Sequence, residues 1–393
     1  MRTVIQNGKL ITPHRVIDGG SIIIQDGLIL GLVESGDVSV SSDDYCIDAQ
    51  GYYVSPGFID MHVHGGGGYD VMDGSVDSIC GMCQAHAAFG TTAIIPTTLA
   101  ADWDDILLAI DAIRAAKNNS IGAKILGVHL EGPYFSQAER GAQSASHLRT
   151  PNPSEYIKVL DYWDGIVIMA LAPELDGALE LGRELRKRGI LASIAHSNAN
   201  YDEIVRAVEN GFTNITHFYS GCSIVHRKNA YRYAGVVESG YLINELTVQV
   251  IADGKHLPSS LLQLIYKLKG SDKIALITDG LSFSAADVKE NTLYTQKTGV
   301  QVILEDDVMK LPDRCSFAGS IATTNSLVRN MIKLANAPLT EAVKMASLTP
   351  ARILNISHKT GSLSVGLAAD IVLFDEDINV SLTMVDGKIV FKK

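Results

Sequence analysis

Short apolar runs alternate with longer amphipathic segments along most of the chain, from Val54 onward. The runs are rich in Val, Ile and Leu and have the length of buried strands in a parallel sheet. They cover Val54 to Met61, Thr92 to Pro96, Ile125 to Leu130, Ile166 to Ala172, Leu191 to Ala195, Asn214 to Thr216, Val248 to Ala252 and Ile274 to Thr278. Helical patterns lie between most of them, at Val76 to Ala88, Trp103 to Ala116, Asp176 to Lys187, Tyr201 to Asn210 and Ser259 to Lys269. Eight strands with intervening helices predict an α/β fold of the (β/α)₈ TIM-type barrel class, in which chemistry sits at the C-terminal strand ends.

The two ends of the chain show a different pattern, that of short β-type segments separated by turn residues. The segments are Thr3 to Ile11, Gly20 to Glu34 and Gly361 to Lys393, and they are broken at Asn7-Gly8, Asp26-Gly27 and Asp386-Gly387. Because one set precedes the barrel and the other follows it, we expect both to join in one small β-sandwich. The predicted domains are therefore a small sandwich from residues 1–53 and 358–393 and a barrel from residues 54–357.

The composition is that of an ordinary globular chain. Of its 393 residues, 46% are hydrophobic and 20% are charged, and the net charge is −11. An acidic chain without a Lys/Arg block has no attraction to nucleic acid or to an anionic membrane, so a small molecule is the expected partner. The segment from Met1 to Gly8 lacks the apolar core of a signal peptide, and no later apolar run approaches bilayer-spanning length. We therefore expect a cytoplasmic protein.

The five cysteines favour reduced thiols over a disulfide framework, because their number is odd and they are scattered. Cys80 and Cys83 form a C-x-x-C pair, but no second pair exists in the sequence. Together with Val76, Ile79 and Ala87 they fall on one face of a predicted helix. This favours burial in the core over a metal or redox site.

Chemically active side chains follow most of the predicted strands. The first strand runs into His62 and His64, which project from one face and can converge on a single cation, and Gly65 to Gly68 leave room for a ligand. Such a pair alone is weak evidence, because paired histidines also occur on solvated strands. The other strand ends carry His129, Glu131, His196, His217, Asp253, His256 and Asp279. In a barrel these groups meet at one mouth.

Glu131, His196 and His217 form the candidate set of metal ligands. Zn²⁺ and similar cations accept imidazole nitrogen and carboxylate oxygen, and a catalytic site needs few enough protein ligands to leave a place for water. Each residue alone would be interpreted as a hydrogen-bonded core histidine or a solvated glutamate. Three of them at the strand ends of one barrel favour a metal site instead.

Three further groups are candidates for catalysis and substrate binding. Asp279 could take a proton from water and return it to a leaving group, although Asp279-Gly280 also fits a plain turn. His256 could donate a hydrogen bond to the charge that develops on an attacked carbonyl, with a solvated loop as the alternative. The run His226-Arg227-Lys228 could bind a phosphate or carboxylate, or could be a solvated surface.

At this point the residues resemble a known family, the amidohydrolase superfamily, and within it the N-acetylglucosamine-6-phosphate deacetylases. The resemblance covers essentially the whole chain and rests on motifs that are specific only in combination. They are Pro56-Gly57-Phe58-Ile59-Asp60-Met61-His62-Val63-His64, Leu130-Glu131-Gly132-Pro133-Tyr134, Ala195-His196-Ser197-Asn198-Ala199, Thr216-His217-Phe218-Tyr219, Ile251-Ala252-Asp253-Gly254-Lys255-His256, Ile277-Thr278-Asp279 and Ala318-Gly319-Ser320.

The resemblance implies a barrel with a small β-sandwich, a homodimer, and hydrolysis of the acetamido group of an amino-sugar phosphate to acetate and a free amine. It implies one or two divalent ions per subunit, with Zn²⁺ favoured and Fe, Mn or Co as alternatives. Glu131, His196 and His217 would be the principal ligands. His62 and His64 would supply a second position, and Asp279 would activate water and protonate the departing nitrogen. The implied substrate contacts are Gly141, Ala142, Ser220, Gly221, His226, Arg227, His256, Ala318, Gly319 and Ser320.

The sequence departs from the family pattern where the substrate would be recognised. Ser220-Gly221-Cys222 stands where the family usually has Asn-Ala-Met, and Lys228 to Tyr233 replaces the usual Glu-Pro-Gly. The segment between His217 and Arg227 is also one residue shorter. N-acetylglucosamine-6-phosphate is the expected substrate. Its galacto epimer, N-acetylgalactosamine-6-phosphate, and another amide of the superfamily stay open as alternatives, as does the need for the phosphate.

Two other classes are disfavoured, namely a cyclic-amide hydrolase or deaminase of the same superfamily and a non-catalytic scaffold. Cyclic-amide hydrolases of the superfamily commonly use a carboxylated Lys to bridge two metals, and the fourth predicted strand ends without one, in Met169 to Ala172. A non-catalytic scaffold descended from such enzymes would be expected to have lost its ligands, whereas all of them are present in this sequence.

Overall fold

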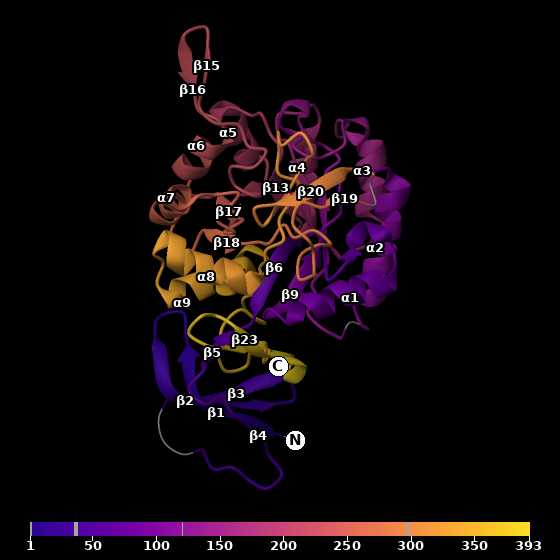
Figure 1. The fold of residues 1–393 in the computed structure, drawn as a ribbon. Coiled ribbons are helices and arrows are strands. Elements are labelled where there is room, and N and C mark those ends of the chain that lie inside the picture. The colour runs from indigo at the N-terminus through magenta and orange to yellow at the C-terminus, as the bar shows by residue number, and fades with distance from the viewer. Residues whose placement is uncertain (1, 35–37, 120, 297–298) are drawn as a thin grey trace.

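The computed structural model describes residues 2–34, 38–119, 121–296 and 299–393. Two parallel sheets form its centre, helices surround them, and a further sheet lies at the bottom of the view in Figure 1. The parallel sheets have the orders β10-β9-β6 and β11-β12-β13-β14-β17-β18. Their strands are β6 (Phe58–Val63), β9 (Thr91–Pro96), β10 (Lys124–Ile125), β11 (Val128–Glu131), β12 (Ile166–Leu171), β13 (Leu191–Ile194), β14 (Phe212–Ile215), β17 (Thr247–Val250) and β18 (Ile274–Leu276).

Backbone bridges link the two parallel sheets into a barrel. Thr97 pairs with His129, and Val63 pairs with Gly280, both in parallel orientation. Within the described residues the strands thereby occupy eight successive positions, of which β10 and β11 share one. The predicted TIM-type barrel is confirmed, and the C-terminal ends of its strands lie on one side.

Two predicted barrel strands are interrupted in the structure. The apolar run that begins at Val54 is divided at Gly57 into β5 (Tyr53–Pro56), which joins the sheet of the chain ends, and β6. The run that begins at Ile125 is divided into β10 and β11. A Cβ added at Gly57 would lie 2.1 Å from Thr92 Oγ1, so only glycine lets the chain pass this close to β9.

Helices cover the outside of the barrel. The five predicted helices appear as α1 (Val76–Ala87), α2 (Trp103–Ala116), α4 (Ala178–Arg188), α5 (Tyr201–Glu209) and α7 (Ser259–Lys269). The pattern did not indicate α3 (Pro153–Leu160), α6 (Val236–Leu242), α8 (Thr324–Ala335), α9 (Leu339–Ala346) and α10 (Leu348–Ile353). Short 3₁₀ turns lie at Val71–Asp73, Gln137–Glu139 and Ala145–His147, and β7 (Gly65–Gly66) pairs with β8 (Tyr69–Asp70). Cys83 is fully buried on α1 and Cys80 packs against the same core, as the helical face predicted.

Both ends of the chain meet in one sheet, with the order β24-β23-β22-β5-β1-β2-β3 and β4 paired to β1 (Figure 1). The remaining strands are β1 (Arg2–Ile11), β2 (Val16–Gln25), β3 (Leu28–Val33), β4 (Tyr45–Asp48), β22 (Ile371–Phe374), β23 (Val380–Val385) and β24 (Lys388–Lys392). Aliphatic side chains from both ends, such as Ile5, Ile22 and Leu373, share a core of their own. The pairings describe a single sheet, and its division into the two layers of a sandwich stays a prediction.

One of the predicted turns is wrong. Asn7 and Gly8 lie inside β1, where Asn7 has a φ of 58° and the pairing with β2 shifts between Ile5 and Gly8. The pair forms a bulge in a continuous strand, which local sequence cannot distinguish from a turn. Asp26-Gly27 connects β2 to β3 and Asp386-Gly387 connects β23 to β24, as predicted.

Two insertions after barrel strands were not predicted. The hairpin of β15 (His226–Lys228) and β16 (Tyr231–Tyr233) projects from the barrel at the top of Figure 1. A three-stranded sheet of β19 (Leu293–Thr295), β20 (Gln301–Glu305) and β21 (Val308–Lys310) follows β18. Among the residues described, no helix has the length and apolar character needed to cross a membrane.

Candidate active site

Six ionisable side chains converge at the C-terminal ends of the barrel strands. They are His62 and His64 on and just after β6, Glu131 at the end of β11, and His196, His217 and Asp279 just after β13, β14 and β18. The histidines and Glu131 are buried, and the side chain of Asp279 is 14% exposed. The barrel thus brings together most of the groups that the sequence predicted at its mouth.

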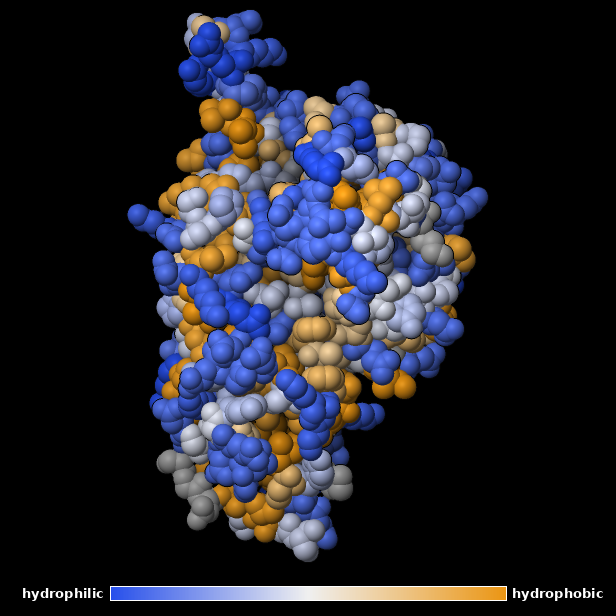
Figure 2. All heavy atoms as spheres, viewed as in Figure 1, coloured by the Kyte–Doolittle hydropathy of each residue, from blue (hydrophilic) through white to orange (hydrophobic). Residues whose placement is uncertain are grey.

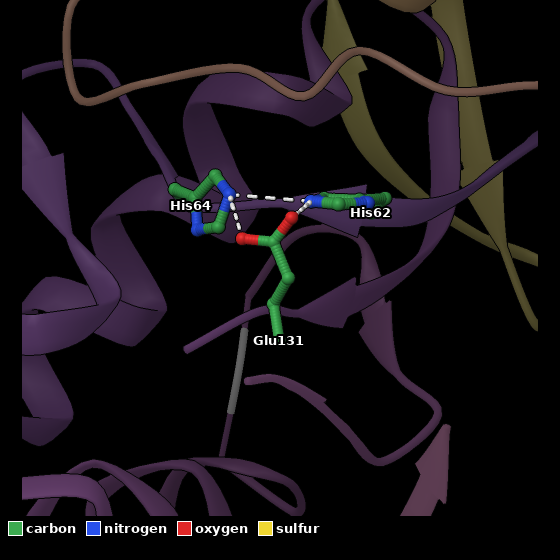
Figure 3. A group of neighbouring side chains, drawn as sticks. All are labelled: His62, His64 and Glu131. Atoms are coloured by element: carbon green, nitrogen blue, oxygen red, sulfur yellow. Dashed lines mark hydrogen bonds and ion pairs between the residues drawn. The ribbon is translucent and has the colours of Figure 1, made fainter. Parts of the chain in front are cut away.

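Glu131 lies at the middle of this cluster. Its Oε1 is 3.0 Å from His217 Nε2 and 3.5 Å from His196 Nε2. Its two oxygens are 3.5 Å from His62 Nε2 and 3.4 Å from His64 Nε2, and Figure 3 shows both rings turned toward the carboxylate. We call Glu131 with His196 and His217 the first metal position, and Glu131 with His62 and His64 the second. Within each, the ligand-type atoms lie within 4.8 Å of one another.

In three of these histidines the inner ring nitrogen is prepared to bind a cation, because the outer nitrogen faces a backbone carbonyl. These contacts are His64 Nδ1 to Thr97 O at 3.1 Å, His196 Nδ1 to Glu139 O at 2.8 Å and His217 Nδ1 to Ser220 O at 2.9 Å. A carbonyl oxygen only accepts, so Nδ1 carries a proton, and Nε2 is the nitrogen that can give its lone pair to a cation. His196 Nε2 is buried without a hydrogen-bond partner, which a bound cation would explain. The residues therefore fit a divalent ion.

The charges in this cluster keep both carboxyl groups ionised. Burial alone would raise the pKa of Glu131, but the imidazoles, His62 first, outweigh burial and hold this pKa well below its usual value. In the same way, His62 and His64 outweigh burial at Asp279 and lower its pKa to about 2. Asp279 Oδ1 is 3.2 Å from His64 Nε2 and 3.4 Å from His62 Nε2. A carboxylate in its basic form beside a cation site can accept a proton from water.

The backbone is left-handed where three of these residues leave their strands. The φ angle is 45° at His196, 29° at His217 and 47° at Asp279. Such angles are uncommon for residues that carry a Cβ, and they cluster at functional sites. These bends accompany the inward direction of the three side chains, and no hydrophobic pattern could indicate them.

A cavity of about 220 Å³ opens over the cluster. Seven of the predicted substrate contacts line it: Gly141, Ala142, Ser220, Gly221, His256, Ala318 and Gly319. Its wall also includes Gln296, Val300 and Phe317, which lie on or near the unpredicted sheet of β19 to β21.

His256 is fixed at the cavity wall by a carboxylate. Its Nδ1 lies 2.7 Å from Asp253 Oδ2, and Asp253 Oδ1 accepts from the backbone N–H groups of Lys255 and His256 at 2.8 Å each. The ring packs against Phe317, with 4.7 Å between ring centroids. This leaves Nε2 as the ring nitrogen available to a ligand.

Three predicted substrate contacts do not line this cavity. His226 and Arg227 are exposed on β15, in the hairpin that points away from the barrel in Figure 1. Ser320 is buried, and its hydroxyl donates to Thr278 O at 2.6 Å. Its position supports the strand end that carries Asp279, and it does not contact the cavity.

Gln143 is a residue of this site that the motifs did not reveal. Its Nε2 donates to Glu131 Oε2 at 2.8 Å, and its Oε1 accepts from Ala100 N at 3.1 Å. The amide thereby orients the central carboxylate. Gln143 directly follows Gly141 and Ala142, but an amide side chain in a loop has no spacing or charge that would single it out.

A TIM-type barrel with histidines and carboxylates gathered at its C-terminal mouth defines a class, the metal-dependent hydrolases built on this fold. The sequence pattern of the Amidohydrolase family matches residues 53–390, and the chain belongs to this family. The chain is 36% identical to N-acetylglucosamine-6-phosphate deacetylase of Vibrio furnissii, over 86% of this chain and 82% of the relative. It is 30% identical to N-acetylgalactosamine-6-phosphate deacetylase of Escherichia coli O157:H7, over 99% of both.

Comparison with solved structures supports the same family assignment. The crystal structure of N-acetylglucosamine-6-phosphate deacetylase from Pasteurella multocida matches with a TM-score of 0.92 and 27% identity, over 100% of both chains. The resemblance to the N-acetylglucosamine-6-phosphate deacetylases that the motifs predicted is thereby confirmed.

Proposed function

We propose that this protein removes the N-acetyl group of an N-acetyl amino-sugar 6-phosphate in a metal-dependent hydrolysis. N-acetylglucosamine-6-phosphate is the first candidate substrate, with glucosamine-6-phosphate and acetate as products. The observation that carries the proposal is the convergence of Glu131, His196, His217 and Asp279 beneath one cavity. N-acetylgalactosamine-6-phosphate is the second candidate, because a relative of nearly the same length is a deacetylase of that epimer.

The residues of the site divide the work of amide hydrolysis. A divalent cation at the first metal position supplies Lewis acidity toward water and the amide carbonyl. Asp279 accepts the proton of the attacking water and then donates it to the departing nitrogen. The Asp253 carboxylate holds His256 through Nδ1, so that Nε2 is the ring nitrogen placed to donate a hydrogen bond to the oxygen on which negative charge develops. Gln143 holds Glu131 in place throughout.

The predicted phosphate contact of Arg227 requires a second copy of the chain. Arg227 and His226 sit on a hairpin that does not line the cavity of its own subunit, and the tip of this hairpin is hydrophilic in Figure 2. At its base, Ile224 and Val225 are 55% and 51% exposed, and Tyr231, which pairs with Lys228 beside the turn, is 73% exposed. Exposed apolar side chains next to a basic tip suit a hairpin that packs on a partner and reaches the partner's cavity. We therefore include a homodimer in the proposal.

The finer expectations from the sequence belong to the same proposal. Zn²⁺ is the favoured ion, because histidine and carboxylate ligands suit it, with Fe, Mn or Co as alternatives. His62 and His64 supply the second metal position. The chain divides into a small sandwich of residues 1–53 and 358–393 and a catalytic barrel of residues 54–357, in a cytoplasmic enzyme that takes a small molecule and neither nucleic acid nor membrane.

Acetate release tests the proposal directly. It is measured with N-acetylglucosamine-6-phosphate, its galacto epimer and the two unphosphorylated sugars. We expect the highest kcat/KM for a phosphorylated sugar, loss of activity after chelation of divalent ions, and recovery when Zn²⁺ is returned. Release of acetate from none of the four would reject the function. Equal rates with and without phosphate would reject the role of Arg227 and leave the metal chemistry standing.

A further inference from the structure

A chain of hydrogen-bonded polar side chains leads from the half-buried Thr247 to His62, and the proposed mechanism gives it no role. Thr247 and Gln249 on β17 and Asn214 on β14 form this chain in the barrel interior. Asn214 and Gln249 have no exposed surface. Polar groups inside a barrel are costly unless they are hydrogen-bonded, and this chain of bonds ends on a proposed metal ligand.

Each link of the chain lies within hydrogen-bonding distance, and the last link, to His62, is the longest. The links are Thr247 Oγ1 to Thr213 O at 3.0 Å, Asn214 Nδ2 to Thr247 Oγ1 at 2.8 Å, Gln249 Nε2 to Asn214 Oδ1 at 2.7 Å and Gln249 Oε1 to His62 Nδ1 at 3.3 Å. Ser193 adds a side branch, because its hydroxyl also donates to Asn214 Oδ1, at 2.9 Å.

The backbone carbonyl at the far end sets the direction of every bond. Thr213 O can only accept, so the Thr247 hydroxyl donates to it and accepts from the Asn214 amide nitrogen. The Asn214 oxygen then faces Gln249 and accepts from its Nε2. The Gln249 oxygen is left facing His62, where it can only accept. His62 Nδ1 must therefore carry the ring proton, which leaves Nε2, next to Glu131 and His64, as the nitrogen that can bind a cation.

We infer that Gln249 is a positioning residue that holds His62 in the tautomer needed to bind a cation, and that it thereby controls occupancy of the second metal position. The inference rests on the proposed function, because it takes the cluster to be a metal site. His64, His196 and His217 receive the same support from backbone carbonyls, which no substitution removes. Among these four histidines, His62 alone depends on a side chain for it.

Gln249→Leu tests this, because leucine fills a similar volume without an acceptor for His62. The loss of a hydrogen bond to a ligating histidine typically costs about 10- to 100-fold in metal affinity. In a zinc titration followed by metal analysis, we expect the second ion to bind about 10- to 100-fold more weakly and the first ion to remain. Nitrogen NMR of the wild type labelled at histidine should show His62 protonated on Nδ1 before metal is added, with its signal assigned by its loss in His62→Asn.

Two variants control for folding and for general disturbance of the barrel interior. Ser193→Ala removes another buried bond to Asn214 and leaves the contact between Gln249 and His62 in place, so it should still bind two ions. In Gln249→Glu, one carboxylate oxygen still faces His62 as an acceptor. The other oxygen can accept from Asn214 Nδ2 if the Asn214 side-chain amide rotates by half a turn. This variant should also retain the second ion, and it keeps the test decisive if Gln249→Leu does not fold.

Three results would overturn the inference: wild-type affinity for both ions in Gln249→Leu, His62 protonated on Nε2, or a wild type that binds only one ion at saturating Zn²⁺. Failure of the proposed function would look different. In that case the wild type would release no acetate from either amino-sugar phosphate, whatever its metal content.

Discussion

In the proposed mechanism, single side chains of the cluster have separable tasks, and Asp279 is the clearest case. Asp279→Asn preserves the shape of the side chain and removes the proton acceptor. We expect kcat for acetate release to fall by about 10²- to 10⁴-fold, the usual contribution of general acid–base catalysis. Metal at the first position should stay near the wild-type level, because Glu131, His196 and His217 are unchanged. Metal analysis and kinetics on one preparation check both points, and near-normal kcat would remove Asp279 from this role.

Gly221 is a residue where a single added carbon should disturb the cluster. Its φ is 55°, and an added Cβ would lie 2.7 Å from His196 Nδ1 and 3.0 Å from Glu139 O. These two atoms form the hydrogen bond that orients His196. Gly221→Ala must push one of them aside, so we expect the first ion to bind about 10-fold more weakly, as for other lost contacts to ligating histidines. A zinc titration measures the change.

Gly189 provides the matched control. It also has a positive φ, of 73°, but an added Cβ would meet nothing within 4 Å. Gly189→Ala should cost about 1 kcal/mol of unfolding free energy from the left-handed backbone and leave zinc affinity unchanged. Equal loss of zinc affinity in both variants would attribute the effect to backbone strain and exclude the clash with His196.

The sequence predicted the metal cluster better than the residues that support it. His196, His217 and Asp279 could be found because each follows an apolar run whose strand type was clear. Gln143 and Gln249 could not be found, because a glutamine has no charge or spacing that marks it, and each meets its carboxylate or imidazole only in the folded barrel. Gly221 was noticed as a departure from the family pattern, and the close approach of His196 now gives a physical reason for glycine there.

Among the elements, several helices with one buried face were predicted, but α8 and α9, which also bury one face, were not. The bounds of α2 and α7 agree with the helical pattern. The breaks at Gly57 and between β10 and β11 escaped prediction, because an apolar run does not reveal where a strand changes its neighbours. The hairpin of β15 and β16 was seen only as a basic run, since its exposed strands lack an apolar face.

One side chain joins α6 to α7. Lys269, at the end of α7, donates to Gly240 O at 2.7 Å and to Leu246 O at 2.8 Å. Lys269→Met keeps the apolar stem and leaves both carbonyls without this donor. We expect the unfolding free energy to fall by about 1 to 3 kcal/mol, the cost of partly buried groups that lose their partner. Denaturant unfolding measures it, and an unchanged midpoint would contradict the role of this contact.

The same lysine predicts a pH dependence. Burial lowers the pKa of Lys269 from 10.5 to about 8, and the nearby Lys273 adds to the effect. Between these values the unfolded chain binds more protons than the folded one, so the contribution of Lys269 to stability rises with pH. This contribution is complete above the pKa of Lys269 in the unfolded chain. It is lost as the pH falls through the pKa of Lys269 in the folded protein. The stability difference between wild type and Lys269→Met should therefore be larger at pH 10 than at pH 7, whereas a constant difference would contradict the lowered pKa.

At the scale of the whole molecule, a buried ion pair ties the sheet of the chain ends to the barrel. Lys124 on β10 lies 2.7 Å from Asp370 Oδ2 and 2.7 Å from Asp386 Oδ1. Asp370 is only 3% exposed, and it also accepts from Thr360 Oγ1 and from the backbone N–H of Asp386. Asp370 precedes β22 and Asp386 follows β23, so one lysine links two strands of the sheet to the barrel.

Lys124→Met should cost more than an exposed ion pair would, because it leaves Asp370 buried without its countercharge. We expect a loss of about 3 kcal/mol of unfolding free energy, at the low end for a broken buried pair because the lysine side chain is 24% exposed. Lys9→Met is the control. Its pair with Glu376 also connects strands of both chain ends, but the side chains are 33% and 83% exposed, so its loss should cost less than about 1 kcal/mol.

A second substitution separates the charge from the packing of the lysine stem. In the Lys124→Met background, Asp370→Asn removes the unpaired charge and should restore part of the lost stability. No restoration would mean that the lysine acts through its apolar stem alone.

The junction between the sheet and the barrel should also affect zinc binding. β5 of the same sheet runs through Gly57 into β6, which carries His62 and leads to His64. Loosening this junction should therefore weaken zinc binding at the second position before the first. Zinc titration of Lys124→Met checks this order, and simultaneous loss of both ions would show that the sheet does not act through β6.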